Sequence, residues 1–412
     1  MSNKAFRARG PLVYNGILMR GPTKARIITA ALCAALTALP AYTSWKAAAL
    51  HGWGARSVKR IPVSYSLLHY PFYMEVPIIP VATGTMRHVS SNTPLGHGRL
   101  MAAWYEGSAE GAADVTINTA TYDEHTLLWS APMQTVSARS ASRELGRFVR
   151  KLGNALVFKD SSERLWLFFA TTSFGGWSDC SLNYKLSTDD GATWGPARQL
   201  ITSPFLNIST NVKNKPVELD DGSLLLPAYH ELASKHSLMV RITPMDAWAD
   251  VVSVDARKMT RSQSAIQPSL IHYGDDRVLT AYMRNMDRGA MLVAQSLDLG
   301  QTWGKTEDSA LPNPNSGADV VVRPDGSYLA ALNWSTSDRR NLKLAVSSDK
   351  GKTWRIVKTL EDSPSGGEFS YPYISRTETG IYHVTYTYDR KTIKHVSFND
   401  DWLALQLEGA AQ

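Results

Sequence analysis

The sequence predicts an all-β fold, a six-bladed β-propeller, preceded by an N-terminal hydrophobic helix. Three observations lead to this fold: an octapeptide that recurs at the spacing of a propeller blade, six tryptophans 48 to 65 residues apart, and six β-rich runs separated by turns. Four strands and their turns fit in about 50 residues, the length of one blade. The hydrophobic fraction of 43% over 412 residues is enough for a large packed body.

The recurring octapeptide has the form Ser-x-Asp-x-Gly-x-Thr-Trp. It begins at Ser187, Ser296 and Ser347, each time directly after a strand-like run. Glycine adopts positive φ at little cost, and Asp, Ser and Thr side chains hydrogen-bond the backbone of their own turn. We therefore interpret each octapeptide as a hairpin turn at a blade edge, with its Trp packed between neighbouring sheets. We do not expect it to belong to an active site.

Weaker copies of the octapeptide complete the count of six blades. They begin near Thr121, Ile242 and Ser397, and each leads to a tryptophan. The propeller is then predicted to occupy residues 75–405, with one β-rich run in each blade. The six blade tryptophans are Trp129, Trp194, Trp248, Trp303, Trp354 and Trp402.

The N-terminal segment has the pattern of an export signal. Residues 1–26 carry six basic and no acidic side chains and are predicted to be a cytoplasmic head, and the apolar run IITAALCAALTAL follows. We predict a signal anchor at 27–45, a connector at 46–74, and a propeller on the extracytoplasmic (periplasmic) side of the membrane, or exported. A cleaved signal or a buried helix of a cytoplasmic protein are the alternatives, because the run is shorter than a span of about 20 residues.

The composition disfavours several other functions. Six of the seven net positive charges lie in the basic head, so the body offers no basic surface for nucleic acid. Two cysteines, Cys33 and Cys180, are too few for a disulfide framework. The sequence has no Cys/His cluster with the spacing of zinc ligands and no Gly-rich phosphate loop, so we expect neither a metal nor a cofactor.

The octapeptides resemble the Asp boxes of the sialidase (neuraminidase) superfamily, in particular those of the bacterial predicted neuraminidases with BNR repeats. Segments such as KNKPVELDDGSLLLPAY, LPNPNSGAD and EFSYPYI share this resemblance, which covers roughly residues 80–400. It implies an exo-glycosidase that hydrolyses a terminal sialic acid or related acidic sugar from a glycoconjugate. Members of the superfamily bind the sugar carboxylate with three arginines. They use a Tyr assisted by a Glu as nucleophile, and an Asp as acid/base.

Three residues match this family pattern. Tyr371, in FSYPYI, resembles the nucleophile and lies 31 residues after Arg340. Arg284, in AYMRN, and Arg340, in DRRNLK, resemble two of the carboxylate-binding arginines. Arginine suits a carboxylate because its planar guanidinium can bind both oxygens. Each residue also has a structural interpretation, as an arginine in a surface salt bridge or a tyrosine packed between blades.

Acidic residues are needed for proton transfer. By resemblance, Asp114 in GAADVTI is the candidate acid/base, with Glu110 as its competitor. Glu231, in YHELASKHS, is the candidate base for Tyr371, since a phenol with an ordinary pKa of about 10 is a poor nucleophile until a base or positive field activates it. If all roles hold, the mechanism is retaining and passes through a tyrosyl-sugar intermediate.

The chain departs from the family pattern at two places. The segment Met86-Arg87-His88-Val89 replaces Phe-Arg-Ile-Pro, so that Arg87 or His88 stands in for the first arginine. The helper Glu is missing, and Gln267, 17 residues before Arg284, is nearest in kind. These departures leave two other functions open. One is a non-catalytic carbohydrate-binding or assembly propeller, and the other is a lyase or hydrolase of another uronic acid.

Overall fold

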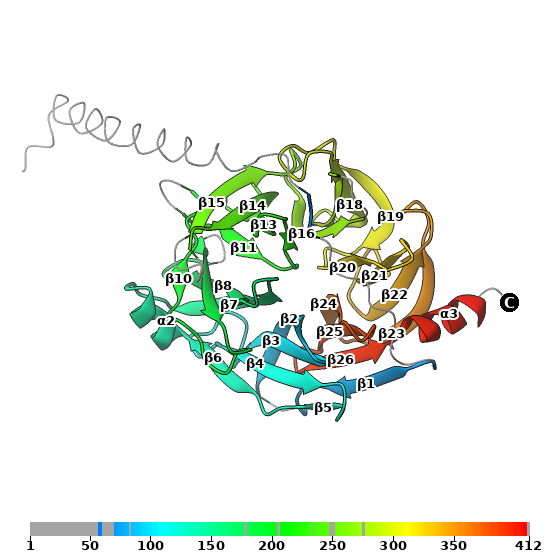
Figure 1. Ribbon diagram of the computed structural model, residues 1–412, viewed down its shortest axis with the longest axis horizontal. Coiled ribbons are helices and arrows are strands. Elements are labelled where there is room, and N and C mark those ends of the chain that lie inside the picture. The colour runs from blue at the N-terminus through cyan, green and yellow to red at the C-terminus, as the bar shows by residue number, and fades with distance from the viewer. Residues whose placement is uncertain are drawn as a thin grey trace, which may run out of the picture. The chain divides into compact units, whose positions relative to one another are not determined.

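The predicted six-bladed all-β propeller is confirmed. In the computed structural model, six antiparallel sheets are arranged as blades around a central axis (Figure 1). The basic head at 1–26, the signal anchor at 27–45 and most of the connector at 46–74 lie outside the described residues. Within the part of the chain that is described, no helix is both long and apolar enough to cross a membrane. The structure describes residues 57–59, 70–81, 84–176, 179–203, 207–232, 234–246, 252–273 and 277–409.

Each blade is a meander whose first strand lies nearest the axis, and we number the blades in chain order. Blade 1 contains β2 (Met86–Gly96), β3 (Arg99–Gly107), β4 (Thr116–Asp123), β5 (Leu128–Trp129) and β6 (Met133–Ser137). After helix α2 (Ala138–Glu144), blade 2 contains β7 (Lys151–Lys159), β8 (Leu165–Thr172), β9 (Ser181–Ser187) and β10 (Arg198–Gln199). Blade 3 contains β11 (Thr210–Val212), β12 (Val217–Glu218), β13 (Leu224–His230), β14 (His236–Pro244) and β15 (Val252–Lys258).

The second half repeats the same plan. Blade 4 contains β16 (Ala265–His272), β17 (Leu279–Asn285), β18 (Gly289–Ser296) and β19 (Glu307–Asn313). Blade 5 contains β20 (Asp319–Val322), β21 (Tyr328–Leu332), β22 (Asn341–Ser347) and β23 (Arg355–Asp362). Blade 6 contains β24 (Phe369–Arg376), β25 (Tyr382–Tyr388), β26 (Thr392–Phe398) and, from the start of the chain, β1 (Tyr73–Pro77).

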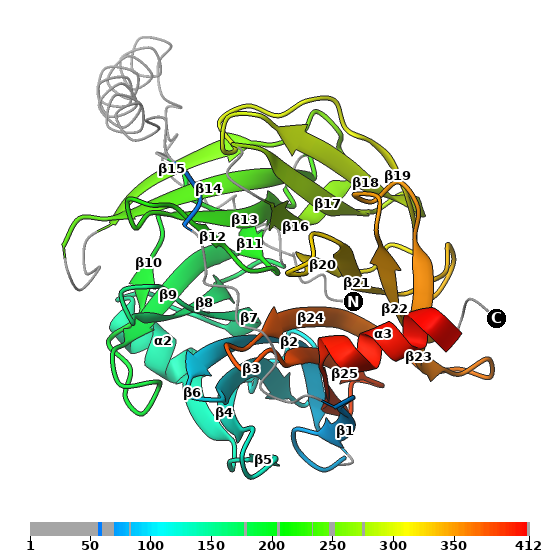
Figure 2. The same cartoon turned by 45° about the vertical axis from the view of Figure 1, so that its right-hand side comes forward.

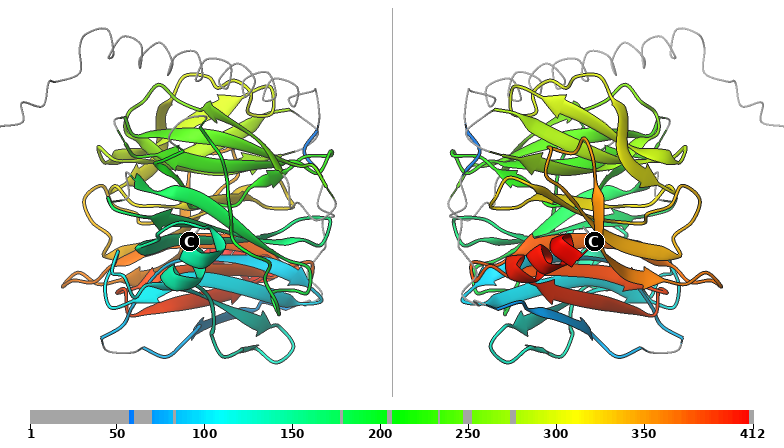
Figure 3. Two further views of the ribbon diagram at one scale, coloured as in Figure 1. Left: turned by 90° about the vertical axis from the view of Figure 1, so that its left-hand side faces the viewer. Right: turned by 90° about the vertical axis from the view of Figure 1, so that its right-hand side faces the viewer.

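The ring closes by pairing the two ends of the described chain. β1 lies antiparallel to β26, with Tyr73 opposite Phe398, and blade 6 packs on blade 1 through β2 (Figure 3). Because β1 fills the outer position, the weak octapeptide copy at Ser397 leads into helix α3 (Asp400–Gly409) instead of a fourth strand. Asn399 fastens this junction, since its side chain accepts from Phe72 N at 3.0 Å. Helix α3 lies beside β23 (Figure 2).

The hydrophobic core is divided into clusters between neighbouring blades. One such cluster joins β2 and β3 to β7 and β8, and the Trp of the first octapeptide, Trp194, packs against it. Trp303 and Trp354 pack in the same way between blades 3 and 4 and between blades 4 and 5. The predicted packing of these tryptophans between sheets is therefore confirmed. Trp104 is 0% exposed, so it cannot stack on a bound sugar, and Trp177, the other candidate for such stacking, lies outside the described residues.

The three full octapeptides form the predicted turns, each between the third and fourth strands of a blade. In the first, Ser187 Oγ donates to Asp189 Oδ1 at 2.7 Å, and Gly191 N donates to Ser187 Oγ at 2.8 Å. Thr193 N donates to Asp189 Oδ1 at 2.9 Å. The hydrogen bond from the Thr193 hydroxyl is the main cause of the lowered pKa of Asp189. The copies at Ser296 and Ser347 repeat these bonds.

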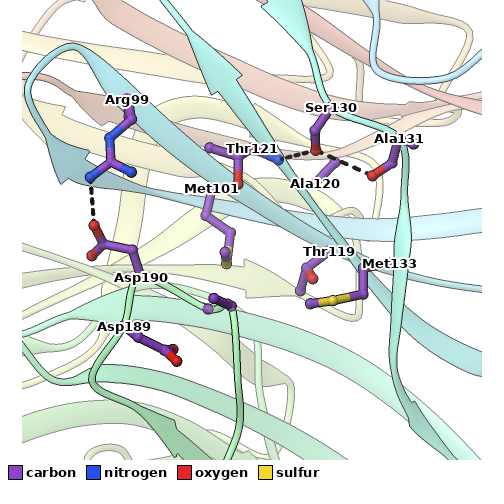
Figure 4. Close-up of a pocket in the computed structure, with 12 residues that line it drawn as sticks. Arg99, Met101, Thr119, Ala120, Thr121, Ser130, Ala131, Met133, Asp189 and Asp190 are labelled. Atoms are coloured by element: carbon purple, nitrogen blue, oxygen red, sulfur yellow. Dashed lines mark hydrogen bonds and ion pairs between the residues drawn. The ribbon is translucent and has the colours of Figure 1, made fainter.

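The octapeptides also attach each blade to the one before it. Gly191 has φ +84°, and a Cβ added there would overlap Met101 Cε of blade 1. Arg99 of blade 1 binds Asp190 at 2.5 Å, beside a pocket of about 340 Å³ between the octapeptide and β4 (Figure 4). A Cβ at Gly351 would overlap Tyr282 Oη of the preceding blade. The glycine is thus required both by the turn and by the contact between blades.

Candidate active site

The inner strands of four blades carry a β-bulge, and each bulge holds one residue at positive φ. The register shifts between His88 and Ser91 in β2, between Gly153 and Leu156 in β7, between Ile266 and Ser269 in β16, and between Ser370 and Tyr373 in β24. Positive φ is strained for any residue other than glycine, and such strain concentrates at functional sites. The four residues are Val89 (φ 48°), Asn154 (φ 41°), Gln267 (φ 51°) and Tyr371 (φ 54°).

The structure brings Tyr371, Arg284 and Gln267 together at the axis. Arg284 Nη1 lies 3.3 Å from Tyr371 Oη and donates to Gln267 Oε1 at 3.2 Å. Its Nε donates to Asn315 Oδ1 at 2.7 Å, which fixes the plane of the guanidinium. The positive charge of Arg284 therefore lies beside the phenol, where it would stabilise a phenolate.

A second arginine contacts Tyr371, but it is Arg339 and not its neighbour Arg340. Arg339 Cζ lies 5.6 Å from the centre of the Tyr371 ring, and its Nη2 donates to the Asn315 carbonyl at 2.7 Å. Arg340, which the sequence analysis assigned to this role, points to the surface. Its side chain is 47% exposed and binds Asp338 Oδ2 at 2.6 Å. Both residues lie in the loop between β21 and β22, where the chain bends, and only Arg339 is directed toward Tyr371.

The residue that β2, the inner strand of blade 1, places against Tyr371 is His88 and not an arginine. The His88 ring meets the Tyr371 ring edge-on at 4.9 Å and is buried. Burial lowers the pKa of His88 to about 3, and the charge of Arg390 acts in the same direction, so the imidazole is neutral and cannot replace a guanidinium. Arg87 instead binds Glu106 Oε2 at 3.2 Å and the carbonyl of Lys391 at 3.1 Å.

Arg390 is a site residue that the sequence analysis missed. Its Nε binds Glu368 Oε2 at 2.7 Å and its Nη1 binds Glu110 Oε2 at 2.6 Å, while Arg339 binds the other oxygen of Glu368 at 3.1 Å. Burial by itself would raise the pKa of Glu368, but the hydrogen bond from Arg390 and the nearby positive charges lower it to about 2. The sequence did contain a signal for Arg390: it comes soon after the second strand of blade 6, just as Arg339 comes after the second strand of blade 5.

The predicted carboxylates differ in their surroundings. Asp114 is exposed and closes its own loop by accepting from Ser108 N and Oγ, both at 3.0 Å. Glu110 is held by Arg390. Glu231 is half-buried, and burial raises its pKa, while the charges of Lys235 and Arg284 oppose this rise. A carboxyl with a raised pKa can exchange a proton closer to neutral pH.

Gln267 connects the site to a buried tyrosine. While its Oε1 accepts from Arg284, its Nε2 donates to Tyr229 Oη at 3.2 Å. Asn154 Nδ2 donates to the same Oη at 2.8 Å. Burial raises the pKa of Tyr229 well above its ordinary value, with Glu231 as the next cause, so this phenol stays neutral. Gln267 thus occupies a position between Arg284 and Tyr229 without being able to accept a proton.

All these groups lie at one edge of the propeller. In an antiparallel meander the start of the first strand meets the end of the second, and the site residues come from these two places in each blade. The full octapeptides follow the third strands and lie at the opposite edge. Among the described residues, no group of three or more His, Cys, Asp or Glu side chains is placed to hold a metal ion.

Sequence comparison agrees with this architecture. The model of the BNR repeat-like domain family matches residues 98–384. The chain belongs to this family. The predicted presence of BNR repeats is therefore confirmed. No curated protein sequence matches the chain.

Solved structures share the fold of this BNR repeat-like protein at low identity. The Hadza microbial sialidase Hz136 is 17% identical with a TM-score of 0.64, over 76% of this chain and 65% of that one, so this chain spans less than two thirds of its length. A leech intramolecular trans-sialidase is 12% identical with a TM-score of 0.61, over 78% and 69%. A protein of unknown function from Dyadobacter fermentans is 11% identical with a TM-score of 0.61, over 79% and 99%.

The arrangement in this BNR repeat-like propeller can bind an anion and position a nucleophile. Three guanidinium groups, those of Arg284, Arg339 and Arg390, surround the edge of the axis at which Tyr371 lies, and two of them share the carboxylate of Glu368. Bidentate guanidinium contacts favour a carboxylate or similar anion. Glu231 and Glu110 place two carboxyl groups at the same edge.

Proposed function

We propose that the protein is an exo-glycosidase that removes a terminal sialic acid or related acidic sugar from a glycoconjugate, with Tyr371 as its nucleophile. The observation that carries this proposal is the 3.3 Å approach of Arg284 Nη1 to Tyr371 Oη on a strained bulge at the propeller axis. A phenol in a positive field is a suitable nucleophile for an anionic sugar, because a carboxylate in its place would be repelled. The sialidase folds among the similar structures support the same choice.

In this mechanism the arginines bind the sugar carboxylate. Arg284 commits Nε to Asn315 and Nη1 to Gln267 and Tyr371, so its Nη2 is the nitrogen that we assign to the substrate. Arg339 approaches from the face of the Tyr371 ring. The anomeric carbon, which carries the carboxylate in a sialoside, would then lie next to Tyr371 Oη.

Proton transfer is assigned to the carboxyl groups. Glu231 takes the phenol proton as the oxygen of Tyr371 attacks the anomeric carbon, and Glu110 or Asp114 protonates the leaving oxygen. Water, deprotonated by the same Glu110 or Asp114, then attacks the anomeric carbon from the face that the leaving group vacated. The bond to Tyr371 breaks, Glu231 returns the proton to the phenol oxygen, and the sugar is released with retained configuration. The raised pKa of Glu231 supports its role, since a base with a pKa nearer the working pH transfers protons more effectively.

The experiment is hydrolysis of a 4-methylumbelliferyl sialoside by the full-length protein, the Tyr371→Phe variant and the Tyr388→Phe variant. Tyr388 lies in the same blade and packs on Phe369, so its variant controls for loss of a hydroxyl in that sheet. We expect turnover in the wild type and in Tyr388→Phe, and a loss of at least about 100-fold in Tyr371→Phe. Turnover that survives in Tyr371→Phe would rule out this nucleophile.

A non-catalytic carbohydrate-binding propeller is the second candidate. Gln267, bonded to both Arg284 and Tyr229, favours it because an amide cannot serve as the base that the family's Glu provides. In that case the wild type would bind a sialoside in calorimetry and release no fluorophore. If the wild type neither binds nor hydrolyses a sialoside, the result would instead point to a different acidic sugar.

We propose in addition that residues 27–45 anchor the protein in the membrane with the propeller outside the cytoplasm. The basic head and the apolar run support this proposal. The test is protease digestion of intact and of permeabilised spheroplasts. Cleavage of the propeller in intact spheroplasts is expected, and protection until permeabilisation would contradict the proposed orientation.

A further inference from the structure

A buried lysine lies beneath Tyr371. Lys213 follows β11 in blade 3, is 3% exposed, and directs its ammonium toward two other blades. Nζ donates to the carbonyl of Ala318 at 3.2 Å, to the carbonyl of Pro372, and to Asn214 Oδ1 at 2.8 Å. An ammonium has three N–H donors, and all three have an acceptor here. The Pro372 carbonyl belongs to the residue directly after Tyr371.

Asn214 extends these contacts to blade 4. Its Nδ2 lies 3.1 Å from the carbonyl of Pro268, 3.3 Å from that of Ala318 and 3.4 Å from that of Gln267. The pair Lys213–Asn214 therefore holds the inner strands of blades 4, 5 and 6 by their backbone carbonyls. Two of those strands carry the bulges of Gln267 and Tyr371.

Gly317 shows how closely these groups meet. A Cβ added at Gly317 would lie 2.9 Å from Gln267 Oε1, 3.1 Å from Tyr371 Cδ1 and 3.4 Å from Lys213 Cε. The space beside Gly317 is therefore bounded by all three side chains at once. A movement of the Lys213 side chain would therefore change the packing of Tyr371 and Gln267.

We propose that Lys213 is a positioning residue for Tyr371: by binding the Pro372 and Ala318 carbonyls, its ammonium holds the Tyr371 backbone in its strained conformation and aims the phenol at Arg284. A buried charge is unfavourable, and an apolar side chain such as Met would fill the same space without that penalty. Unlike Met, the lysine has N–H donors, which bind the carbonyls of Ala318 in blade 5 and Pro372 in blade 6. Only the activity measurement below depends on the proposed glycosidase function.

The charge state of Lys213 gives the proposal a distinct signature. Burial lowers its pKa to about 7, the charge of Lys215 acts in the same direction, and the charge of Asp319 opposes it. The centre of the Tyr373 ring lies 5.9 Å from its ammonium. A neutral amine has two N–H donors, so loss of the proton releases one of the three acceptors.

The test is fluorine NMR of the full-length protein labelled with 3-fluorotyrosine, with the Tyr371 resonance assigned by Tyr371→Phe. Lys213→Met is compared with Lys185→Met, in which a second buried lysine, bound to Glu144 at 2.8 Å in blade 2, is replaced. We expect the Tyr371 resonance to shift in Lys213→Met and to stay in place in Lys185→Met. In the wild type it moves with a midpoint near pH 7, and in Lys213→Met this titration is absent.

An unchanged Tyr371 resonance in a folded Lys213→Met protein overturns the proposal. Should that variant not fold, Lys213→Leu, which removes the same three donors, takes its place with the same two outcomes. If the wild type hydrolyses the sialoside, Lys213→Met should lose at least about 10-fold in kcat with KM within about twofold, as expected for a misaligned nucleophile. If the wild type hydrolyses nothing, the resonance still settles the role of Lys213.

Discussion

The guanidinium of Arg339 lies 5.6 Å from the centre of the Tyr371 ring, while the adjacent Arg340 binds Asp338 at the surface. The two arginines are adjacent in the sequence, yet only Arg339 lies against Tyr371, while Arg340 lies at the surface. The pair offers an experiment with an internal control, because both variants remove one positive charge from the same segment.

Arg339→Met is predicted to lower kcat/KM for an acidic glycoside by about 100-fold, and Arg340→Met by less than about twofold. Arg339 is placed to stabilise the anionic substrate and the phenolate, and Arg340 contacts neither. The measurement is steady-state hydrolysis of the 4-methylumbelliferyl sialoside. Equal effects of the two variants would mean that Arg339 acts only through the net charge of the loop.

The fold could be predicted from the sequence because its signals are local. The turn of the octapeptide at Ser187 is formed by its own side chains, and such turns recur at blade spacing. Trp194 packs between blades as expected. The last blade could not be predicted in full, since its outer strand, β1, comes from the other end of the described chain.

The site could be predicted only in part, for a different reason. Tyr371, Arg284 and Gln267 lie on strands or bulges whose place is fixed by the blade, and they meet at the axis. The choice between Arg339 and Arg340 depends on the orientation of one loop. The position of Arg390 after the second strand of blade 6 could have been noticed by analogy with Arg339, but its contact with Glu368 forms only when blade 6 is folded.

Glu368→Gln is predicted to flatten the dependence of stability on acid pH. The pKa of Glu368 is lowered from 4.5 to about 2, so its ionised form stabilises the folded protein. This contribution is full above about pH 4.5 and is lost as the pH falls toward about 2. With 26% of the side chain exposed, it amounts to about 2 kcal/mol.

The measurement is urea unfolding of both proteins between about pH 2 and about pH 7. Glu163→Gln, in which the replaced side chain is 78% exposed, serves as the control. The wild type and Glu163→Gln should lose stability together as the pH falls. Parallel curves for the wild type and Glu368→Gln would show that Arg339 and Arg390 do not hold the carboxylate in solution.

Gly351→Ala is predicted to destabilise the propeller more than Gly222→Ala. Both glycines have positive φ, +84° and +75°, so an alanine strains the backbone at either position by about 1 kcal/mol. Only at Gly351 would the new methyl group also overlap a neighbour, Tyr282 Oη of the preceding blade, which adds about 1–3 kcal/mol. Nothing lies within 4 Å of the corresponding position at Gly222. Chemical unfolding of the two variants measures the difference, and equal losses would mean that the octapeptide does not fasten blade 5 to blade 4.

Gln267→Glu is predicted to raise kcat and to raise KM. A carboxylate at this position would lie where Gln267 Oε1 accepts from Arg284 at 3.2 Å, next to Tyr371, and could take the phenol proton that an amide cannot. The same negative charge would neutralise part of the Arg284 field and so weaken binding of an anionic sugar. We expect kcat to rise by about 10-fold and KM by several-fold, while Gln267→Met, which removes the bond to Arg284, should lower kcat. If Gln267→Glu lowers kcat as well, a second carboxylate adds nothing to Glu231 as the base for Tyr371, and the amide at this position serves to hold Arg284 and Tyr229 in place.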